Sequence, residues 1–493
     1  MALEIRRRIR GNLYGSIDIS ALEDRVIAHP IFQRLRRIKQ TAFLSYVFPG
    51  ASHTRFEHSL GVLHLAGWAW GKIKDNQTRL RFLCSSYQDF KKLEREASPG
   101  LIHGLLAPTF PWIDDIFSSD YVFQTLRLAA MLHDVGHPPF SHSGERFLPT
   151  FKLILKANPQ LPEYLKAYMV EKAEGVDSVA SHEIMTVILA DKMLSEINRE
   201  HGKDALRIDP QDVVSVILPE LAPSPHSELK AHGVHRMCHE LVSGEVDIDR
   251  MDYLCRDAKE CGVAYGLFDI DRIMDSLAIY YNPDDEAVHL AVQDNGLAAF
   301  EDYLRARQSM FRQLYFHKTS VSCEAMLQHL DRKLRRRLPA SADDYYKIDE
   351  YSMMPYMIQS GKEMRPQVAT EVESVLADLI LNRRLWKLVW EHGGKKDDAE
   401  IERIVKRLEE EDIESELISS VNVMTKFRPR KKGQKSQHSL RLIKRGTQSM
   451  PRVEALEDFS SIMGEQTIQL QRIYVKSKDA ERAKRLMTSP IHY

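Results

Sequence analysis

The stretch MLHDVGHPPFSHSGE, residues 131–145, ends an apolar helical run and then gathers ionisable side chains. Three histidines and two carboxylates fall within thirteen residues, and Gly136, Pro138 and Pro139 make the chain turn among them. A single histidine near a helix end would be expected to cap a carbonyl or to pack as a neutral ring. The density of this cluster instead indicates a functional site.

Apolar residues at helical spacing dominate the chain on both sides of this stretch. The clearest segments are residues 23–40, 58–70, 181–197 and a long run from 296 to 338. Strand-like alternation is confined to four short segments, at residues 12–20, 287–294, 439–445 and 468–475. The patterns therefore predict a mostly α protein with small β elements.

Composition limits the class of protein further. The 493 residues are 43% hydrophobic and 28% charged, enough for a large core of two or three packed units. A formal net charge of -1 argues against a dedicated nucleic-acid or membrane-surface protein, although local basic patches remain compatible with it. The five cysteines form no CxxC pair, and no apolar run approaches about 18 residues. We expect a soluble, cytoplasmic protein with reduced thiols and no membrane contact.

Changes in composition suggest a domain division. We expect a catalytic core over residues 1–340, a helical connector over 341–390 and a C-terminal α+β unit over 391–493. Gly/Pro/Ser-rich sequence within residues 74–120 predicts an insertion that covers the site or binds a protein partner. The basic stretch 426–445 suits an anionic effector, a nucleic acid as a secondary partner, or a solvated loop.

A divalent metal needs several ligands that converge from separate elements, and histidine with aspartate suits Mn, Fe or Zn. His133 and Asp134 point about 100° apart on a helix, so further ligands must come from elsewhere. His58 lies at a predicted helix start, and the segment SGEVDIDRMDYLCRDAKE (243–260) adds Asp247, Asp249 and Asp252. Asp249, Tyr253, Arg256 and Asp257 share one helical face, which is either a phosphate-binding face or an ordinary polar surface.

The sequence FPGASHTRFEHSLGV, LHDVGHPPFSHSGE and DIDRMDYLCRDA, with an H…HD…D order, resembles the HD-domain metal phosphohydrolases. Within them it is similar to the deoxynucleoside triphosphate triphosphohydrolases, which include the human SAM-and-HD-domain enzyme and bacterial dGTP triphosphohydrolases. The similarity extends from residue 12 to residue 486, nearly the whole catalytic core. It implies an HD-domain helical core and one divalent metal (Mn, Fe, Zn or Mg), with a second ion left open. The implied metal ligands are His58, His133, Asp134 and Asp249, whereas Asp247 is expected to be structural.

The resemblance also implies a catalytic group. His142 matches the family's catalytic histidine, and Glu145 matches the carboxylate that holds it. The pairing has its own physical sense, because a carboxylate on one ring nitrogen fixes the tautomer and raises the basicity of the other. His137 and His182 match further active-site histidines, and the alternative for both is a core or capping role.

Substrate contacts follow from the same resemblance. The expected phosphate ligands are Arg55, Arg250, Tyr253, Arg307, Tyr315 and Lys318. Counting 100° per residue, positions 307, 315 and 318 lie within about 80° of one another, so one face of the long helix can present all three, although a dispersed basic helix would look similar. Gln40 and Asp257 match positions that contact the sugar 3′-hydroxyl. The implied reaction cleaves a dNTP at the α-phosphorus into deoxynucleoside and inorganic triphosphate.

Three features concern regulation and specificity. Gln33, Arg34 and Arg36 match a nucleotide-activated segment of the animal enzyme, which implies a dNTP- or GTP-type activator and a homo-oligomer (dimer-based, tetramer or hexamer). Ala28 replaces a guanine-reading aspartate of that segment, so GTP need not be the ligand. Thr41 replaces the family leucine after the glutamine, which leaves discrimination against the ribose 2′-hydroxyl open.

Alternatives remain open for one further metal site and for the function. The residues His232, His235, Cys238 and His239 have zinc-like spacing, but an amphipathic helix explains them more simply. A rival function is an HD phosphodiesterase or nucleotidase, for which His137 and His142 would complete a second metal site. Another is a nucleotide-sensing protein whose pocket controls assembly or a partner.

Overall fold

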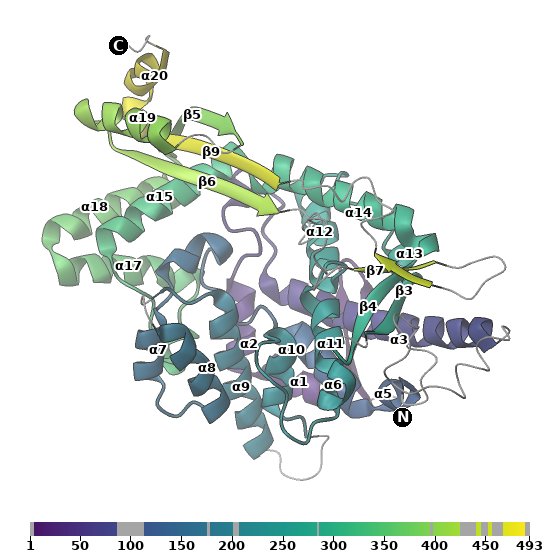
Figure 1. The fold of residues 1–493 in the computed structure, drawn as a ribbon. Coiled ribbons are helices and arrows are strands. Elements are labelled where there is room, and N and C mark those ends of the chain that lie inside the picture. The colour runs from purple at the N-terminus through teal and green to yellow at the C-terminus, as the bar shows by residue number, and fades with distance from the viewer. Residues whose placement is uncertain are drawn as a thin grey trace.

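The computed structural model describes residues 4–85, 113–174, 178–200, 207–282, 285–394, 398–423, 440–444, 452–455 and 467–488 (Figure 1). The helices of its larger part are α1 (Ala21–Ala28), α2 (Pro30–Gln33), α3 (Arg55–Ser85), α5 (Ile113–Ser118), α6 (Asp120–Leu132), α7 (Phe151–Ala157), α8 (Glu163–Ala173), α9 (His182–Glu200), α10 (Pro210–Ile217), α11 (Val234–Ser243), α12 (Ile248–Cys261), α13 (Ile270–Met274), α14 (Leu297–Met310), α15 (Lys318–Leu334), α16 (Ala342–Tyr345), α17 (Glu350–Met364) and α18 (Pro366–Leu376). The mostly α prediction is confirmed. No helix in the described ranges is long and apolar enough to span a membrane.

Three small sheets accompany the helices. They are β1 (Ile5–Gly11) with β2 (Gly15–Ser20); β3 (Leu277–Asn282), β4 (Ala287–Gln293), β7 (Arg441–Lys444) and β8 (Arg452–Ala455); and β5 (Lys387–Gly393), β9 (Thr467–Val475) and β6 (Ser415–Val423), in these orders. All four segments with strand-like patterns contribute a strand. β1 was not expected, because its sequence, IRRRIRG, carries no apolar alternation, and β3, β5, β6 and β8 were not predicted either.

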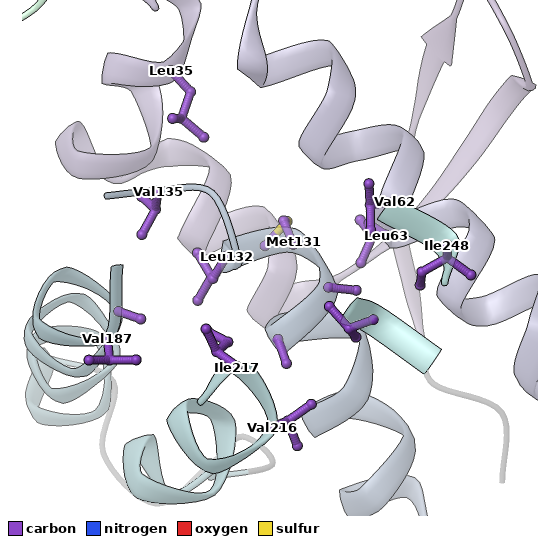
Figure 2. Packing of buried hydrophobic residues seen from close by; sticks show 14 of the residues in the cluster. Leu35, Val62, Leu63, Met131, Leu132, Val135, Val187, Val216, Ile217 and Ile248 are labelled. Carbon is purple, nitrogen blue, oxygen red and sulfur yellow. The ribbon is translucent and has the colours of Figure 1, made fainter. Parts of the chain in front are cut away.

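Helix α6 is buried from Gln124 to Leu132 and leads directly into the HD sequence. Ser119 caps its start by accepting a hydrogen bond from the Val122 amide at 3.2 Å. Met131, Leu132 and Val135 are fully buried, with side chains from α3, α9 and α10 around them (Figure 2). Burial on this scale, about 1.5–3 kcal/mol for each large apolar side chain, fixes the end of α6.

The prediction that Arg307, Tyr315 and Lys318 lie on one long helix is wrong, because the helical run of residues 296–338 is interrupted. It consists of α14, a π-helical turn (Phe311–Tyr315) and α15. His317 is extended (φ -62°, ψ 128°), and its Nδ1 accepts the Thr319 amide at 3.2 Å, so it starts a new helix. The count of 100° per residue therefore does not relate positions 307, 315 and 318, because the wide turn and the extended residue change the rotation between them.

The C-terminal part contains a helix-covered sheet. α19 (Asp398–Glu410) and α20 (Ala480–Thr488) pack on β5-β9-β6 around Ile473 and Val475, while Tyr474, which alternates with them, joins the main core on the side of α15 (Figure 1). β7 instead pairs in parallel with β4. The proposed domain boundaries stay predictions. Most of the basic stretch, and residues 86–112 of the expected insertion, lie outside the described residues, whereas residues 74–85 continue α3.

Candidate active site

The end of α6 presents two of the predicted ligands. The imidazole Nδ1 of His133 lies 2.8 Å from the Ala130 carbonyl and donates to it, so Nε2 is the nitrogen left to face the site. Gly136 lets the next turn approach α9 closely, because a Cβ at this position would overlap the Thr186 amide and the His182 carbonyl. The sequence after α6 thus folds tightly against the start of α9.

His58 from α3 and Asp249 from α12 complete this group. His58 Nε2 lies 3.0 Å from Asp249 Oδ1 and 3.4 Å from Asp134 Oδ2. His133 Nε2 lies 3.3 Å from Asp249 Oδ1 and 3.4 Å from Asp134 Oδ1. The ligand atoms of His58, His133 and Asp134 lie within 4.8 Å of one another, as the ligands of one ion do, and Asp249 Oδ1 adjoins both histidine nitrogens.

Unpaired nitrogen atoms and the charge of the group also indicate a metal site. The Nε2 atoms of both His58 and His133 are buried and have no hydrogen-bond partner among the described residues. Burial alone would raise the pKa of Asp249, but His133 and His58 outweigh it and hold the pKa below its ordinary value. The carboxylate charge and the two buried nitrogens fit a divalent cation, and such groups are uncommon in a core without one.

A further carboxylate supports this group from behind. Asp252 accepts from His58 Nδ1 at 2.7 Å and from the Arg256 guanidinium at 2.8 and 2.9 Å. Gly61 makes room, since a Cβ there would overlap the Asp252 carboxylate. Asp252 was noted as a carboxylate of the segment but given no role. Its position one helical turn after Asp249 was the available signal.

The second predicted group surrounds Glu145. Its Oε1 accepts from His142 Nδ1 and from His182 Nδ1, both at 2.7 Å. His137 stacks on His182 with ring centroids 3.7 Å apart, and its Nε2 lies 3.2 Å from Asp134 Oδ1. Burial alone would raise the pKa of Glu145, but the two histidine hydrogen bonds lower it below the ordinary value. The four predicted catalytic side chains therefore lie together beside the metal ligands, and His142 is the exposed member, at 72%.

The predicted phosphate ligands are less uniform. Arg55 is buried, pairs with the Asp134 carboxylate and donates to Ser141 Oγ at 2.9 Å. Arg250 donates to the Gly244 carbonyl at 2.7 Å. Burial raises the pKa of Tyr253 to about 12, although the charges of Arg307 and Arg250 oppose the rise. Both guanidinium groups therefore lie close enough to the phenol to act on it electrostatically.

The remaining two phosphate candidates differ in exposure. Tyr315 is half-buried in the π-helical turn, and Lys318 is the exposed first residue of α15.

Asp247, expected to be structural, is the N-cap of α12 and accepts a hydrogen bond from the Arg250 main-chain amide at 2.8 Å.

The predicted sugar contacts form a connected group. Asp257 accepts from the Tyr315 hydroxyl at 2.7 Å and contacts His53 Nε2 at 2.6 Å. The main-chain amide of Gln40 donates to the His53 carbonyl at 3.1 Å. The side-chain oxygen of Gln40, Oε1, is buried without a partner in the described ranges. His53 was not predicted, and nothing in its sequence context distinguishes it from a loop histidine.

The predicted regulatory residues lie in different surroundings, some near the surface and one in the core. Gln33 donates to the Ile27 carbonyl at 2.6 Å and accepts from Arg36 Nε at 2.9 Å. Arg34 is completely buried and donates to the carbonyl oxygens of Ile348, at 2.7 Å, and Val135, at 3.4 Å. Arg34 therefore supports the core in this conformation, while Arg36 lies at a cavity.

The zinc-like segment contains the expected amphipathic helix. α11 includes His235, Cys238 and His239, but His232 precedes it with a left-handed backbone (φ 50°). His239 Nδ1 contacts the Val216 carbonyl at 2.9 Å. Among the described residues, the groups with metal-ligand spacing do not include this segment.

Comparison with known proteins shows what the chain resembles. A family profile described as HD associated region matches residues 268–437. The uncharacterised protein YwfO of Bacillus subtilis is 28% identical over 73% of this chain and 66% of its own. The deoxynucleoside triphosphate triphosphohydrolase SAMHD1 of Gallus gallus is 23% identical over 83% of this chain and 56% of its own, and that of Homo sapiens is 25% identical over 72% and 47%.

The chain thus spans about half to two thirds of the length of these curated relatives. Two crystal structures have the same fold: a hypothetical protein from Aquifex aeolicus (TM-score 0.62, 21% identity, 98% of this chain and 100% of that one) and a phosphohydrolase from Bacteroides thetaiotaomicron (TM-score 0.61, 21% identity, 95% and 99%). The resemblance to HD-domain triphosphohydrolases is confirmed.

Proposed function

We propose that this relative of the HD-domain phosphohydrolases is a metal-dependent dNTP triphosphohydrolase that releases deoxynucleoside and inorganic triphosphate. The observation that carries the proposal is the convergence of four ligand side chains, from α3, α6 and α12, beside the His142–Glu145 pair. In this proposal His58, His133, Asp134 and Asp249 hold one divalent cation. When bound, it would neutralise phosphate charge and lower the pKa of a water ligand.

The protein's own groups supply positioning and proton transfer. Glu145 fixes the His142 ring through Nδ1, so Nε2 is the atom that would donate a proton to the departing 5′-oxygen. The guanidinium groups of Arg250 and Arg307, with Lys318, would bind the phosphates. Arg55 is already paired with Asp134, so it would exchange or share this contact when a phosphate binds.

Regulation by a nucleotide is part of the proposal. A cavity of about 330 Å³ is lined by Arg10, Arg36 and Arg256, with Tyr14 and Phe56 as aromatic walls. Arg36 stacks on Phe56 at 3.5 Å, measured from the guanidinium carbon to the ring centroid. Cations beside aromatic rings suit a phosphorylated, planar ligand, which supports Arg36, a lining residue, rather than the buried Arg34 as a regulatory contact, with Gln33 holding Arg36 through its side-chain oxygen. We extend the proposal to a homo-oligomer by analogy with the relatives.

One observation favours a second function. His137, His142, Glu145 and His182 also have ligand atoms close enough to hold an ion. Two adjacent metals would suit an HD phosphodiesterase or nucleotidase acting on a cyclic or monophosphate nucleotide. Such an enzyme would release no inorganic triphosphate.

Product analysis tests the two functions. The protein is incubated with Mn²⁺ and each dNTP, singly and mixed, and the products are separated by ion-exchange chromatography. Deoxynucleoside with intact triphosphate supports the proposal, and turnover only in mixtures supports an activator. An Asp249→Ala variant is the control for contaminating hydrolases. Intact dNTPs under all conditions, with cleavage of a cyclic or monophosphate nucleotide, would favour the second function.

A further inference from the structure

We propose that His53 is a positioning residue that fixes Asp257, and with it the Gln40–Asp257 pair, for recognition of the substrate's 3′-hydroxyl. This inference rests on the proposed function. His53 Nε2 lies 2.6 Å from Asp257 Oδ1, and the Tyr315 hydroxyl donates to Oδ2 at 2.7 Å. Each carboxylate oxygen thus has its own donor, which leaves the group one orientation.

Burial makes this contact consequential. The side chains of His53 and Asp257 are only 4% and 3% exposed. A carboxylate at such a depth that lost one donor would rotate or take up water, because an unsatisfied buried acceptor is costly. Burial, with the charge of Asp257, raises the pKa of Tyr315 well above its ordinary value, so the phenol keeps the proton that it donates.

The backbone of the same residue holds the other half of the pair. The His53 carbonyl accepts a hydrogen bond from the main-chain amide of Gln40 at 3.1 Å, and Lys39 and Thr54 form a β-bridge beside it. The Arg55 amide donates to the Ile38 carbonyl at 2.9 Å. Residue 53 therefore links the segment that carries Gln40 to α12, which carries Asp257. Gln40 Oε1 is buried without a partner in the described part of the chain, so it lacks the hydrogen bond that a ligand hydroxyl would supply.

The geometry distinguishes which ring atom matters. A carboxylate only accepts, so Nε2 carries the hydrogen in the contact with Asp257. A glutamine amide nitrogen can reach the position of Nε2, whereas an asparagine amide reaches only that of Nδ1. His53→Gln should therefore keep Asp257 in place and His53→Asn should release it. A side chain that only filled space would show no such difference.

The test measures kcat/KM for the dNTP that the wild type hydrolyses fastest and divides it by kcat/KM for the 2′,3′-dideoxy analogue of the same nucleotide. We expect His53→Asn to lower this ratio about tenfold and His53→Gln to keep it within about threefold. In an Asp257→Ala background, His53→Asn should lower the ratio no further. Thermal melting checks folding, and His53→Ser replaces His53→Asn if the latter does not fold.

The outcomes separate the two proposals. Hydrolysis of dNTPs with the same ratio in wild type and His53→Asn would overturn the role of His53 alone, as would additive effects of His53→Asn and Asp257→Ala. A wild-type protein that hydrolyses no dNTP under any metal or nucleotide condition would overturn the proposed function and this inference with it.

Discussion

His58 Nδ1 donates to Asp252 Oδ2 over 2.7 Å, and both side chains are completely buried. The contact directs His58 Nε2 at Asp249 Oδ1, 3.0 Å away. A carboxylate behind a metal-binding histidine fixes the ring and raises its basicity. Asp252 is thus expected to control metal affinity although it does not face the proposed ion.

We expect Asp252→Asn to weaken Mn²⁺ binding by about 10–100-fold, because the amide is a weaker acceptor for the His58 ring. Isothermal titration of the metal-free protein measures the change. Arg256→Gln is the matched control, since it breaks the other contact of Asp252 and leaves the His58 bond in place. Equal losses of metal affinity in both variants would contradict a specific role for the His58–Asp252 bond.

His142→Ala should lower kcat by about 10²–10⁴-fold, the usual contribution of a general acid. The metal content should stay that of the wild type, because His142 is outside the four-ligand group and its side chain is 72% exposed. Steady-state kinetics with metal analysis on the same sample checks both statements. A His142→Ala protein with full activity would remove the proton-donor assignment.

The sequence predicted helices and strands best where apolar spacing was regular. α3, α6 and α9 were expected from their patterns, and β4 and β9 from alternation. The break between α14 and α15 was missed because residues 311–317 contain neither glycine nor proline. Its cause is local backbone geometry and the cap made by His317, which periodicity does not encode.

The roles of the site residues stay predictions, but the structure shows which contacts the sequence could indicate: those between close neighbours or within the family's motifs, and not a distant contact outside them. His142 and Glu145 are three residues apart and contact each other. His53 and Asp257 are 204 residues apart, so their contact exists only in the folded chain. Arg34, matched to a regulatory segment, is completely buried here, and its burial could not be read from the sequence because the carbonyls that it contacts come from distant segments.

Thr41 gives a prediction for sugar specificity. Its Oγ1 is buried without a hydrogen-bond partner in the described structure, and it follows Gln40. We expect wild type to hydrolyse ribonucleotides as well as deoxynucleotides, because a hydroxyl here can pair with the ribose 2′-hydroxyl. Thr41→Leu should raise the preference for dNTP over NTP by about tenfold, and the isosteric Thr41→Val should separate loss of the hydroxyl from added bulk. Competition assays with dATP and ATP give the ratio, and a wild type strictly selective for dNTPs would contradict the prediction.

Glu414 connects the C-terminal sheet to α15. Its Oε2 contacts Lys476 Nζ at 2.6 Å, and Oε1 lies 3.4 Å from His329 Nδ1 and 3.3 Å from Lys333 Nζ. Burial alone would raise the pKa of Glu414, but the contact with Lys476 and the nearby His329 and Lys333 lower it from 4.5 to about 2. A carboxyl whose pKa falls on folding stabilises the folded state fully above the unfolded value of 4.5, and this contribution is lost as the pH falls toward 2.

At pH 7 we expect Glu414→Gln to lower the free energy of unfolding by about 1–2 kcal/mol, after allowance for the solvent that reaches the side chain. At pH 3 the difference from wild type should be smaller, because the wild-type carboxyl then loses part of its advantage. Denaturant unfolding followed by tryptophan fluorescence suits the measurement, since Trp386 lies beside His329, with ring centroids 5.2 Å apart. The control is Glu410→Gln on α19, whose carboxylate is 4.0 Å from Lys406 Nζ and 65% exposed, and which should cost under about 0.5 kcal/mol. A difference between wild type and Glu414→Gln that stayed constant from pH 7 to pH 3 would show that the charge of Glu414 does not hold the sheet to α15.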